Sequence, residues 1–181
     1  MIVHKKGRSQ MEFLLEKCEI EETDSIVHLI ETVYEQMTEK EWFAADNGEY
    51  TRETLISGQG RAYKAVEALS GRMAAVFMTS YPGLSSENLG LDIGLPKDQL
   101  NKVAHMDSAA VLPQYRGHGL QRRLMQMAEP DLINEGYRYL CCTVHPDNQY
   151  SLNSILSQGY RIMATREKYG GYLRHILMKE L

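Results

Sequence analysis

The 181-residue sequence has few cysteines, no long apolar run and no excess of positive charge, and each absence excludes a class of protein. Its three cysteines are an odd number, and Cys141 and Cys142 are adjacent, which does not fit the disulfide framework of a small secreted domain. No segment approaches the ~20 apolar residues of a membrane span. The net charge of −4 lacks the basic excess of nucleic-acid-binding proteins. We expect a cytoplasmic protein with reduced thiols that binds neither nucleic acid nor a membrane.

The composition that remains is that of an ordinary globular protein. Hydrophobic residues make up 43% of the chain and charged residues 24%, a balance that favours a folded core over disorder. A chain of this length can bury such a core as one domain, and it contains no internal repeat, low-complexity tract or linker. We therefore predict a single domain over residues 1–181, in which residues 1–10 form a loose leader.

Apolar periodicity and turn residues predict the elements of the N-terminal half. A helix capped by Thr23 or Asp24 carries apolar residues at helical spacing, namely Ile26, Leu29, Ile30, Val33 and Met37. The pair Ser70-Gly71 separates two strand-like runs, which predicts a hairpin. The expected strands and remaining segments are strands over 12–16, 62–68 and 73–79, a short helix over 51–56, and a loop over 81–97.

The C-terminal half has clearer patterns. Leu120, Leu124 and Ala128 recur at helical spacing after Gly119, and Pro130 is expected to kink or end that helix. The other expected elements are strands over 101–111, 137–144, 160–169 and 172–179, and a helix from the turn at 146–148 to residue 159. Strands mixed with helices in this order predict an α/β domain with a mixed sheet.

The segment from Ala109 to Leu120 is the most informative part of the sequence. A short apolar strand ends in a loop with two spaced glycines, Gly117 and Gly119, and the loop opens directly into a helix. Main-chain N–H groups at such a junction point outward, and the helix dipole adds partial positive charge. This arrangement binds phosphate or pyrophosphate without a cationic side chain.

Two common phosphate-binding loops do not match this segment. The sequence has no G-x-x-x-x-G-K-[ST], which excludes a nucleotide triphosphatase loop. Arg122 stands where G-x-G-x-x-G requires its third glycine, and the loop lies late in the chain, so a dinucleotide-binding fold is disfavoured.

Three motifs at defined distances resemble those of the GNAT acyltransferase superfamily. Residues 114–119 carry Gln-x-x-Gly-x-Gly after Val-x-Pro, residues 144–148 read Val-His-Pro-Asp-Asn, and residues 159–160 read Gly-Tyr. The resemblance extends from about residue 102 to residue 181, whereas the N-terminal half agrees only in element order. It implies a mixed, mostly antiparallel central sheet flanked by helices. It also implies acetyl-CoA as cosubstrate and a primary amine of a small molecule or peptide as acceptor, and it admits a homodimer.

The resemblance assigns cofactor contacts residue by residue and implies no metal. In that family the loop amides bind the pyrophosphate, and the preceding strand splays from its neighbour and pairs with the pantetheine arm. The residues implied in cofactor binding are Ala109, Ala110, Val111, Gln114, Arg116, Gly117, His118, Gly119, Leu120, Asn148 and Ser151. Arg122 and Arg123 follow the loop, either as phosphate contacts or as a solvated helix face.

The strand before the loop offers the candidate bases for deprotonating an amine, namely His105 and Asp107. Alternation on a strand places both on one face with Ala109 and Val111. Asp107 is favoured because ordinary core positions rarely carry aspartate. The alternative is structural: Asp107 caps a bulge or pairs with a lysine, and His105 lies on the surface.

Two further groups of residues concern the proton donor and a possible metal site. The family's frequent tyrosine, which protonates the leaving thiolate, is replaced by Ile155, so Tyr150, Tyr160, Tyr169 or water would have to substitute. Because adjacent strand residues face opposite sides, the cysteines at 141 and 142 together with His145 indicate core packing rather than a metal site.

Three hypotheses about function follow. The leading one is direct acetyl transfer to an amine. The second is a non-catalytic acyl-CoA-binding domain with a sensing or interaction role, suggested by Ile155 and by the absence of an obvious base. The third is a protein-interaction module that keeps the fold without the cofactor. The acceptor would be selected by the N-terminal helices and the loop over residues 81–97, where no recognisable pattern occurs.

Overall fold

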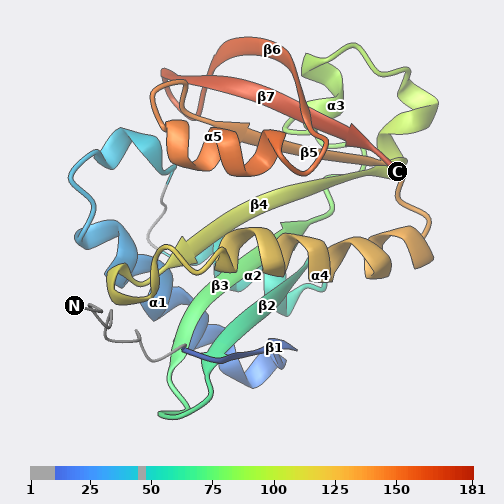
Figure 1. The fold of residues 1–181 in the computed structure, drawn as a ribbon. Coiled ribbons are helices and arrows are strands. Elements are labelled where there is room, and N and C mark those ends of the chain that lie inside the picture. Colours follow the sequence, from blue (N-terminus) through green and yellow to red (C-terminus); the bar gives the residue numbers. More distant parts are fainter. Residues whose placement is uncertain (1–10, 45–47) are drawn as a thin grey trace, which may run out of the picture.

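The computed structural model describes residues 11–44 and 48–181, so the leader predicted for residues 1–10 lies outside the described part. Seven strands form one sheet in the order β1-β2-β3-β4-β5-β7-β6 (Figure 1). Their bounds are β1 (Phe13–Lys17), β2 (Gly60–Glu67), β3 (Met73–Ser80), β4 (Val103–Val111), β5 (Tyr139–Val144), β6 (Arg161–Lys168) and β7 (Tyr172–Glu180). All neighbouring pairs are antiparallel except β4 and β5, which confirms a mixed, mostly antiparallel sheet.

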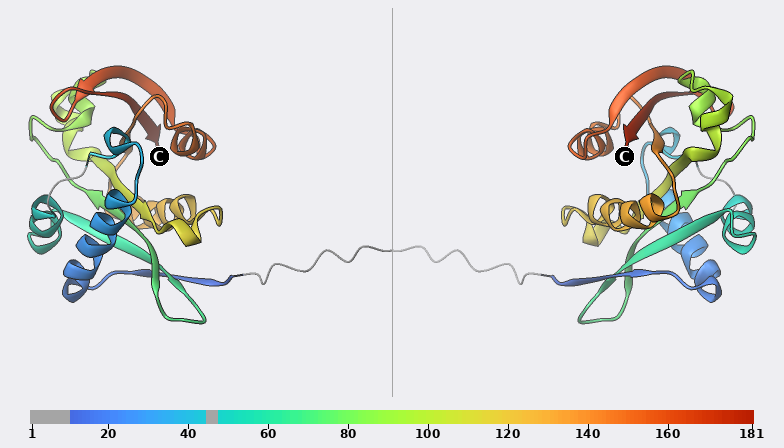
Figure 2. Two further views of the ribbon diagram at one scale, coloured as in Figure 1. Left: turned by 90° about the vertical axis from the view of Figure 1, so that its left-hand side faces the viewer. Right: turned by 90° about the vertical axis from the view of Figure 1, so that its right-hand side faces the viewer.

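Helices cover both faces of the sheet (Figure 2). They are α1 (Thr23–Glu35), α2 (Glu49–Ile56), α3 (Leu89–Asp92), α4 (Leu120–Asn134) and α5 (Gln149–Leu156), with 3₁₀ turns η1 (Ile20–Glu22), η2 (Lys40–Trp42), η3 (Lys97–Lys102) and η4 (Pro113–Tyr115). Helices α4 and α5 lie on one face, and α1 and α2 lie on the other. None of the helices in the described ranges is long and apolar enough to cross a membrane.

The helices bury the apolar side chains that recur at helical spacing in the sequence. On α4, Leu120, Leu124 and Ala128 are at most 2% exposed and pack into the largest core cluster, against β3 and β4. On α1, Ile26 and Val33 belong to a second cluster on the opposite face of the sheet. The sheet is therefore held between two apolar layers, and burial of these side chains provides most of the favourable folding free energy.

Strands β4 and β5 separate soon after they pair. The parallel pairing covers only Val103–His105 against Tyr139–Cys141, although β4 continues to Val111. Beyond residue 105, no described strand pairs with the β5-facing edge of β4. Main-chain groups along this edge are therefore open to an extended ligand, as the resemblance implied.

A bulge in β4 alters the face on which its side chains lie. Met78 pairs with Ser108 but Thr79 pairs with Met106, which leaves Asp107 as an extra residue. Met106 consequently shares the α4-side core with Ala109 and Val111. The expectation that His105 and Asp107 share one face with Ala109 and Val111 is wrong, because the bulge reverses the alternation.

Three local predictions also need correction. Thr23 does not cap α1 through its side chain; it is the first helical residue, and its hydroxyl donates to the Ile20 carbonyl at 2.6 Å. Helix α4 continues past Pro130, because Pro130 and Gln126 are both exposed and solvent can satisfy the carbonyl that the proline leaves unpaired. The loop over residues 81–97 contains one helical turn, α3, capped by the side chain of Asn88.

Candidate active site

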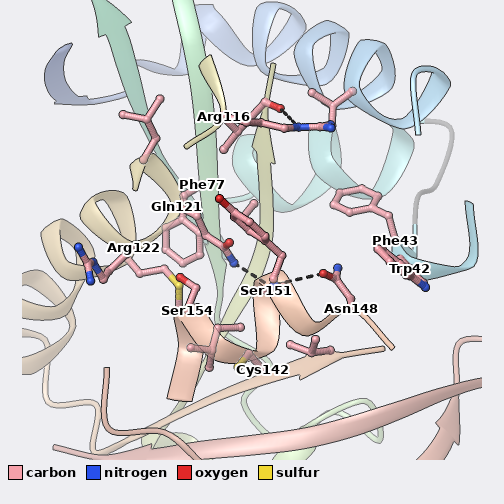
Figure 3. Close-up of a pocket in the computed structure, with 18 of the residues that line it drawn as sticks. Trp42, Phe43, Phe77, Arg116, Gln121, Arg122, Cys142, Asn148, Ser151 and Ser154 are labelled. Carbon is pink, nitrogen blue, oxygen red and sulfur yellow. Dashed lines mark hydrogen bonds between the residues drawn. The ribbon is translucent and has the colours of Figure 1, made fainter. Parts of the chain in front are cut away.

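A groove of about 1140 Å³ lies between the open edge of β4, the start of α4 and the start of α5 (Figure 3). We call it the loop groove. Its polar rim comes from the glycine loop and from α5, and its apolar wall includes Phe77, Leu120, Met125, Val144 and Ile155. A long groove with an apolar wall and a main-chain phosphate cradle at one end fits an elongated acyl-thioester ligand.

Both loop glycines adopt a backbone conformation that other residues rarely adopt. Gly117 has φ +84°, and Gly119, with φ +67°, is the N-cap of α4. A Cβ at Gly117 would meet nothing within 4 Å, and one at Gly119 would meet only Arg122 Nη2 at 3.8 Å. The space in front of the loop is therefore open to a ligand, and the first-turn amides of the 15-residue helix α4 provide the anion-binding dipole.

Cationic side chains flank this cradle. Arg116 and Arg122 line the loop groove, and Arg116 Nε donates to the Val111 carbonyl at 3.4 Å. Arg123 instead reaches the Phe13 carbonyl through Nη2 at 3.5 Å and does not line the groove. Two guanidinium groups beside an open helix N-terminus suit a pyrophosphate.

The opposite wall is set by the cap of α5. Asn148 is the N-cap, and its Oδ1 accepts a hydrogen bond from the Ser151 amide at 3.1 Å. Gln121 Nε2 on α4 donates to Ser151 Oγ at 3.2 Å, which ties the two helix starts together across the groove (Figure 3). Asn148 and Ser151 thus lie where the sequence motif predicts them.

The loop groove collects most of the predicted cofactor residues. Those that line it are Ala109, Val111, Arg116, Gly117, His118, Gly119, Leu120, Asn148 and Ser151. Ala110 and Gln114 are not among the lining residues. The Ala110 side chain is 1% exposed and packs under α1, and Gln114 is exposed in η4.

A second cavity of about 470 Å³, which we call the side cavity, lies next to the loop groove. Both are lined by the same six residues, which we call the junction: Trp42, Phe43, Met106, Asp107, Cys142 and Thr143. The junction lies where β4 and β5 diverge, since Met106 and Cys142 directly follow the last paired residues, His105 and Cys141. The junction residues therefore lie between the two cavities, and a group bound in each cavity would come nearest to the other there.

Asp107 is held at the junction by hydroxyl groups from three elements. Its Oδ2 accepts hydrogen bonds from Tyr50 and Ser80, both at 2.6 Å, and its Oδ1 accepts one from Ser108 at 3.2 Å. Desolvation and the charge of Asp107 raise the pKa of Tyr50, so the phenol remains a donor. The carboxylate is therefore fixed in orientation and faces both cavities.

His105 lines the side cavity but is engaged by the main chain. Its Nε2 accepts a hydrogen bond from the Leu89 amide at 3.0 Å. Burial lowers the pKa of His105 to about 4. Because the acceptor nitrogen is occupied and the ring resists protonation, the geometry favours Asp107 over His105 as the base.

The candidate tyrosines lie in different environments. Tyr150 lines the loop groove but is 79% exposed, and Tyr160 is 2% exposed with a buried hydroxyl and lines neither cavity. The Tyr169 hydroxyl lies 3.2 Å from Thr143 Oγ1 at the junction. Tyr169 is also the one non-glycine residue with positive φ, 54°, in the described ranges. A strained backbone that places a hydroxyl at the junction makes Tyr169 the best positioned of the three.

The cysteines and His145 take part in core packing and in a local turn. Cys141 and Cys142 pack into cores on opposite faces, and burial raises the pKa of Cys141 to about 12. His145 Nδ1 accepts a hydrogen bond from the Asp147 amide at 3.2 Å. Within the described ranges, no three His, Cys, Asp or Glu residues cluster as metal ligands would.

Several residues of the site carry no local signal in the sequence. Tyr50 and Ser80 reach Asp107 from other elements, and Tyr172 and Arg174 line the side cavity from β7. From the sequence, Tyr172 is only the first residue of an expected strand, and Tyr169 is only one of three possible substitutes for the missing tyrosine. Their part in a cavity depends on the tertiary fold.

Comparison with known proteins finds one family model that matches part of this chain and solved structures that have a similar fold. Residues 86–160 match the acetyltransferase (GNAT) family. A search of the curated proteins finds no match. A GCN5-related N-acetyltransferase from Kribbella flavida superposes with a TM-score of 0.67 at 22% identity, over 93% of this chain and 98% of that one.

Two further solved structures have the same fold at lower identity. The NatC complex bound to Gag peptide and CoA gives a TM-score of 0.71 at 18% identity, over 94% of this chain and 99% of that one. A putative acetyltransferase from Salmonella typhimurium, solved with its cofactor acetyl-CoA, gives a TM-score of 0.67 at 13% sequence identity. The superposition covers 93% of this chain and 94% of that one. The predicted resemblance and fold class are thereby confirmed.

Proposed function

We propose that this chain belongs to the GNAT superfamily, as its family match over residues 86–160 and its fold support, and that it is an N-acetyltransferase. It would move an acetyl group from acetyl-CoA to a primary amine of a small molecule or peptide. One observation carries the proposal. The loop groove and the side cavity share the six junction residues, and Asp107, the one carboxylate among these six, lines both cavities.

The residues present fit acetyl-CoA. The amides of residues 116–120, with the guanidinium of Arg122, would hold the pyrophosphate. The open edge of β4 would pair with the pantetheine arm, beside Asn148 and Ser151. When bound, acetyl-CoA supplies a thioester whose C–S bond breaks as the amine nitrogen forms a C–N bond.

The protein's own groups account for the protons of this exchange. An ammonium cannot attack a carbonyl, so Asp107 would take a proton from the amine at the junction. Tyr50 and Ser80 hold the carboxylate in place for that role. Tyr169, beside Thr143, would give a proton to the departing thiolate. Phe43 and Trp42 cover the junction and limit access of water.

Calorimetry with acetyl-CoA, followed by a CoA-release assay over a panel of primary amines, tests the proposal. We expect saturable binding and sustained release of CoA with some amines. Absence of acetyl-CoA binding would contradict the proposal and favour an interaction module. Binding without turnover on any amine would favour the non-catalytic acyl-CoA-binding domain.

A further inference from the structure

Arg174 on β7 is a buried cation that the proposed transfer of acetyl does not use. Its side chain is 2% exposed and lines the side cavity. Nη2 donates to the Glu41 carbonyl at 2.6 Å, and Nη1 donates to the Leu173 carbonyl at 3.0 Å. The rings of Tyr169 and Tyr172 lie 5.9 Å and 5.4 Å from its guanidinium carbon. The group is thus held in a fixed position between η2 and the turn between β6 and β7.

Arg174 differs from the other buried cations in its partners. Lys64 and Lys168, with side chains 14% and 15% exposed, bond to the carboxylates of Glu22 and Asp92 at 2.6 Å and 2.9 Å. No carboxylate of the described residues lies within ion-pair distance of Arg174. Burial accordingly lowers the pKa of its guanidinium. In the described ranges the partners of Arg174 are carbonyls and aromatic rings, and the Glu41 charge acts on it from beyond ion-pair distance. Such burial of a charge is costly, which makes Arg174 a candidate for binding a ligand.

The side cavity presents both signs of charge to its contents. Its charged lining residues in the described ranges are Glu87, Asp107 and Arg174. A guanidinium is the side chain best suited to bind a carboxylate in a two-pronged manner. Aromatic rings of Tyr34, Phe43 and Tyr172 line much of the remaining surface. A volume of about 470 Å³ is suited to a molecule of the size of an amino acid or a short peptide.

We propose that the side cavity takes an acceptor bearing a carboxylate as well as the reacting amine, that is, an amino acid or a short peptide, with Arg174 binding the carboxylate. The proposal rests on the proposed acetyl transfer, and it adds the class of acceptor. The amine would lie at Asp107 in the junction, and the acid group would give Arg174 a carboxylate at ion-pair distance, which no residue of the described ranges provides. The aromatic lining favours apolar side chains.

The experiment compares acceptors that differ only in the acid group. Leucine, methionine and phenylalanine, and the dipeptide Gly-Leu, are each assayed as free acid and as carboxamide by CoA release. With the wild-type protein, at least one free acid should have a kcat/KM about tenfold or more above that of its amide. A preference among dipeptides but not among amino acids would identify a peptide terminus as the source of the carboxylate.

Variants at Arg174 separate recognition from structure. In Arg174→Met the free acid should fall to the level of the amide, while the amide stays within about threefold of its wild-type value. Arg174→Lys keeps the charge without the planar fork and should retain part of the preference. The matched control is Arg166→Met, which removes the arginine paired opposite Arg174 on β6 and lines neither cavity. It should leave the preference unchanged.

Several outcomes would overturn the assignment. Equal rates for acids and amides in the wild type would do so even if Arg174→Met does not fold. If kcat/KM fell equally for the acids and the amides in Arg174→Met, Arg174 would only hold η2 in place through its hydrogen bond to the Glu41 carbonyl. If no acceptor releases CoA, thermal shifts decide: acids must stabilise the wild type more than their amides do, and this difference must vanish in Arg174→Met. Failure of acetyl-CoA binding in calorimetry would instead count against the proposed function.

Discussion

The loop groove and the side cavity meet at the junction but are built in different ways. The anion cradle of the groove is main chain from one continuous segment, residues 116–120, at the start of α4. The side cavity takes its polar groups from separate elements. The bond from Tyr50 to Asp107 spans 57 positions, and the bond from Arg174 to Glu41 spans 133. Cofactor binding can therefore be encoded locally, whereas acceptor binding depends on the assembled fold.

The largest expected effect separates chemistry at the junction from binding in the groove. In Asp107→Asn the geometry is kept but the proton acceptor is lost, so kcat should fall by about 10² to 10³-fold. Binding of acetyl-CoA, measured by calorimetry, should stay within about twofold. The matched control is Asp98→Asn, which removes the same charge from an exposed carboxylate on η3. If Asp107→Asn had the kcat of the wild type, Asp107 would not be the base.

The next effect should be confined to the groove. Gly117→Ala places a Cβ in the open space before the loop and forces alanine to φ +84°, at about 1 kcal/mol of stability. We expect acetyl-CoA to bind about 30-fold more weakly by calorimetry. Gly136→Ala is the matched control, because Gly136 follows α4 at its other end with φ +87° and equally open surroundings. The two variants should lose similar stability in urea, but only Gly117→Ala should lose affinity.

A smaller effect concerns the proton returned to the thiolate. Tyr169→Phe removes the hydroxyl beside Thr143, and kcat should fall about tenfold, since a thiolate is a good leaving group and water can replace the donor in part. Acetyl-CoA affinity should be unchanged. Tyr160→Phe is the control, because that hydroxyl lines neither cavity. If Tyr160→Phe shows the loss and Tyr169→Phe does not, the roles given to the two tyrosines are wrong.

The same contrast explains what could be predicted from the sequence. The glycine loop, the Asn148 cap and the closing hairpin are local patterns, and the structure places them as expected. A bulge at Asp107 was only one of the structural alternatives for that residue, because the extra residue is fixed by register with β3 and carries no turn residue. The continuation of α4 through Pro130 depends on solvent around one carbonyl. Tyr50 and Arg174 needed the tertiary fold, since nothing near them in sequence marks a cavity.

His105 lines the side cavity, and its protonation can be tested through the pH dependence of stability, without an activity assay. Burial lowers its pKa to about 4, and the groups around it are Asp107 and Asp92, which raise that pKa, and Lys168, which lowers it. The unfolded chain, with an ordinary histidine pKa near ~6.5, therefore binds more protons between those values, so the free energy of unfolding falls as pH drops through this window. A shift from ~6.5 to about 4 predicts a loss of about 2 kcal/mol from pH 7 to pH 5.

Urea unfolding from pH 7 to pH 5 measures this loss. In His105→Gln the side-chain oxygen can still accept the Leu89 N–H bond but has no proton to take up, so the part of the pH dependence due to this ring should disappear. His28→Gln, at an exposed position of α1, should keep the wild-type slope. An unchanged slope in His105→Gln would mean that His105 takes up protons in the folded state, and its nitrogen would then become available as a base beside Asp107.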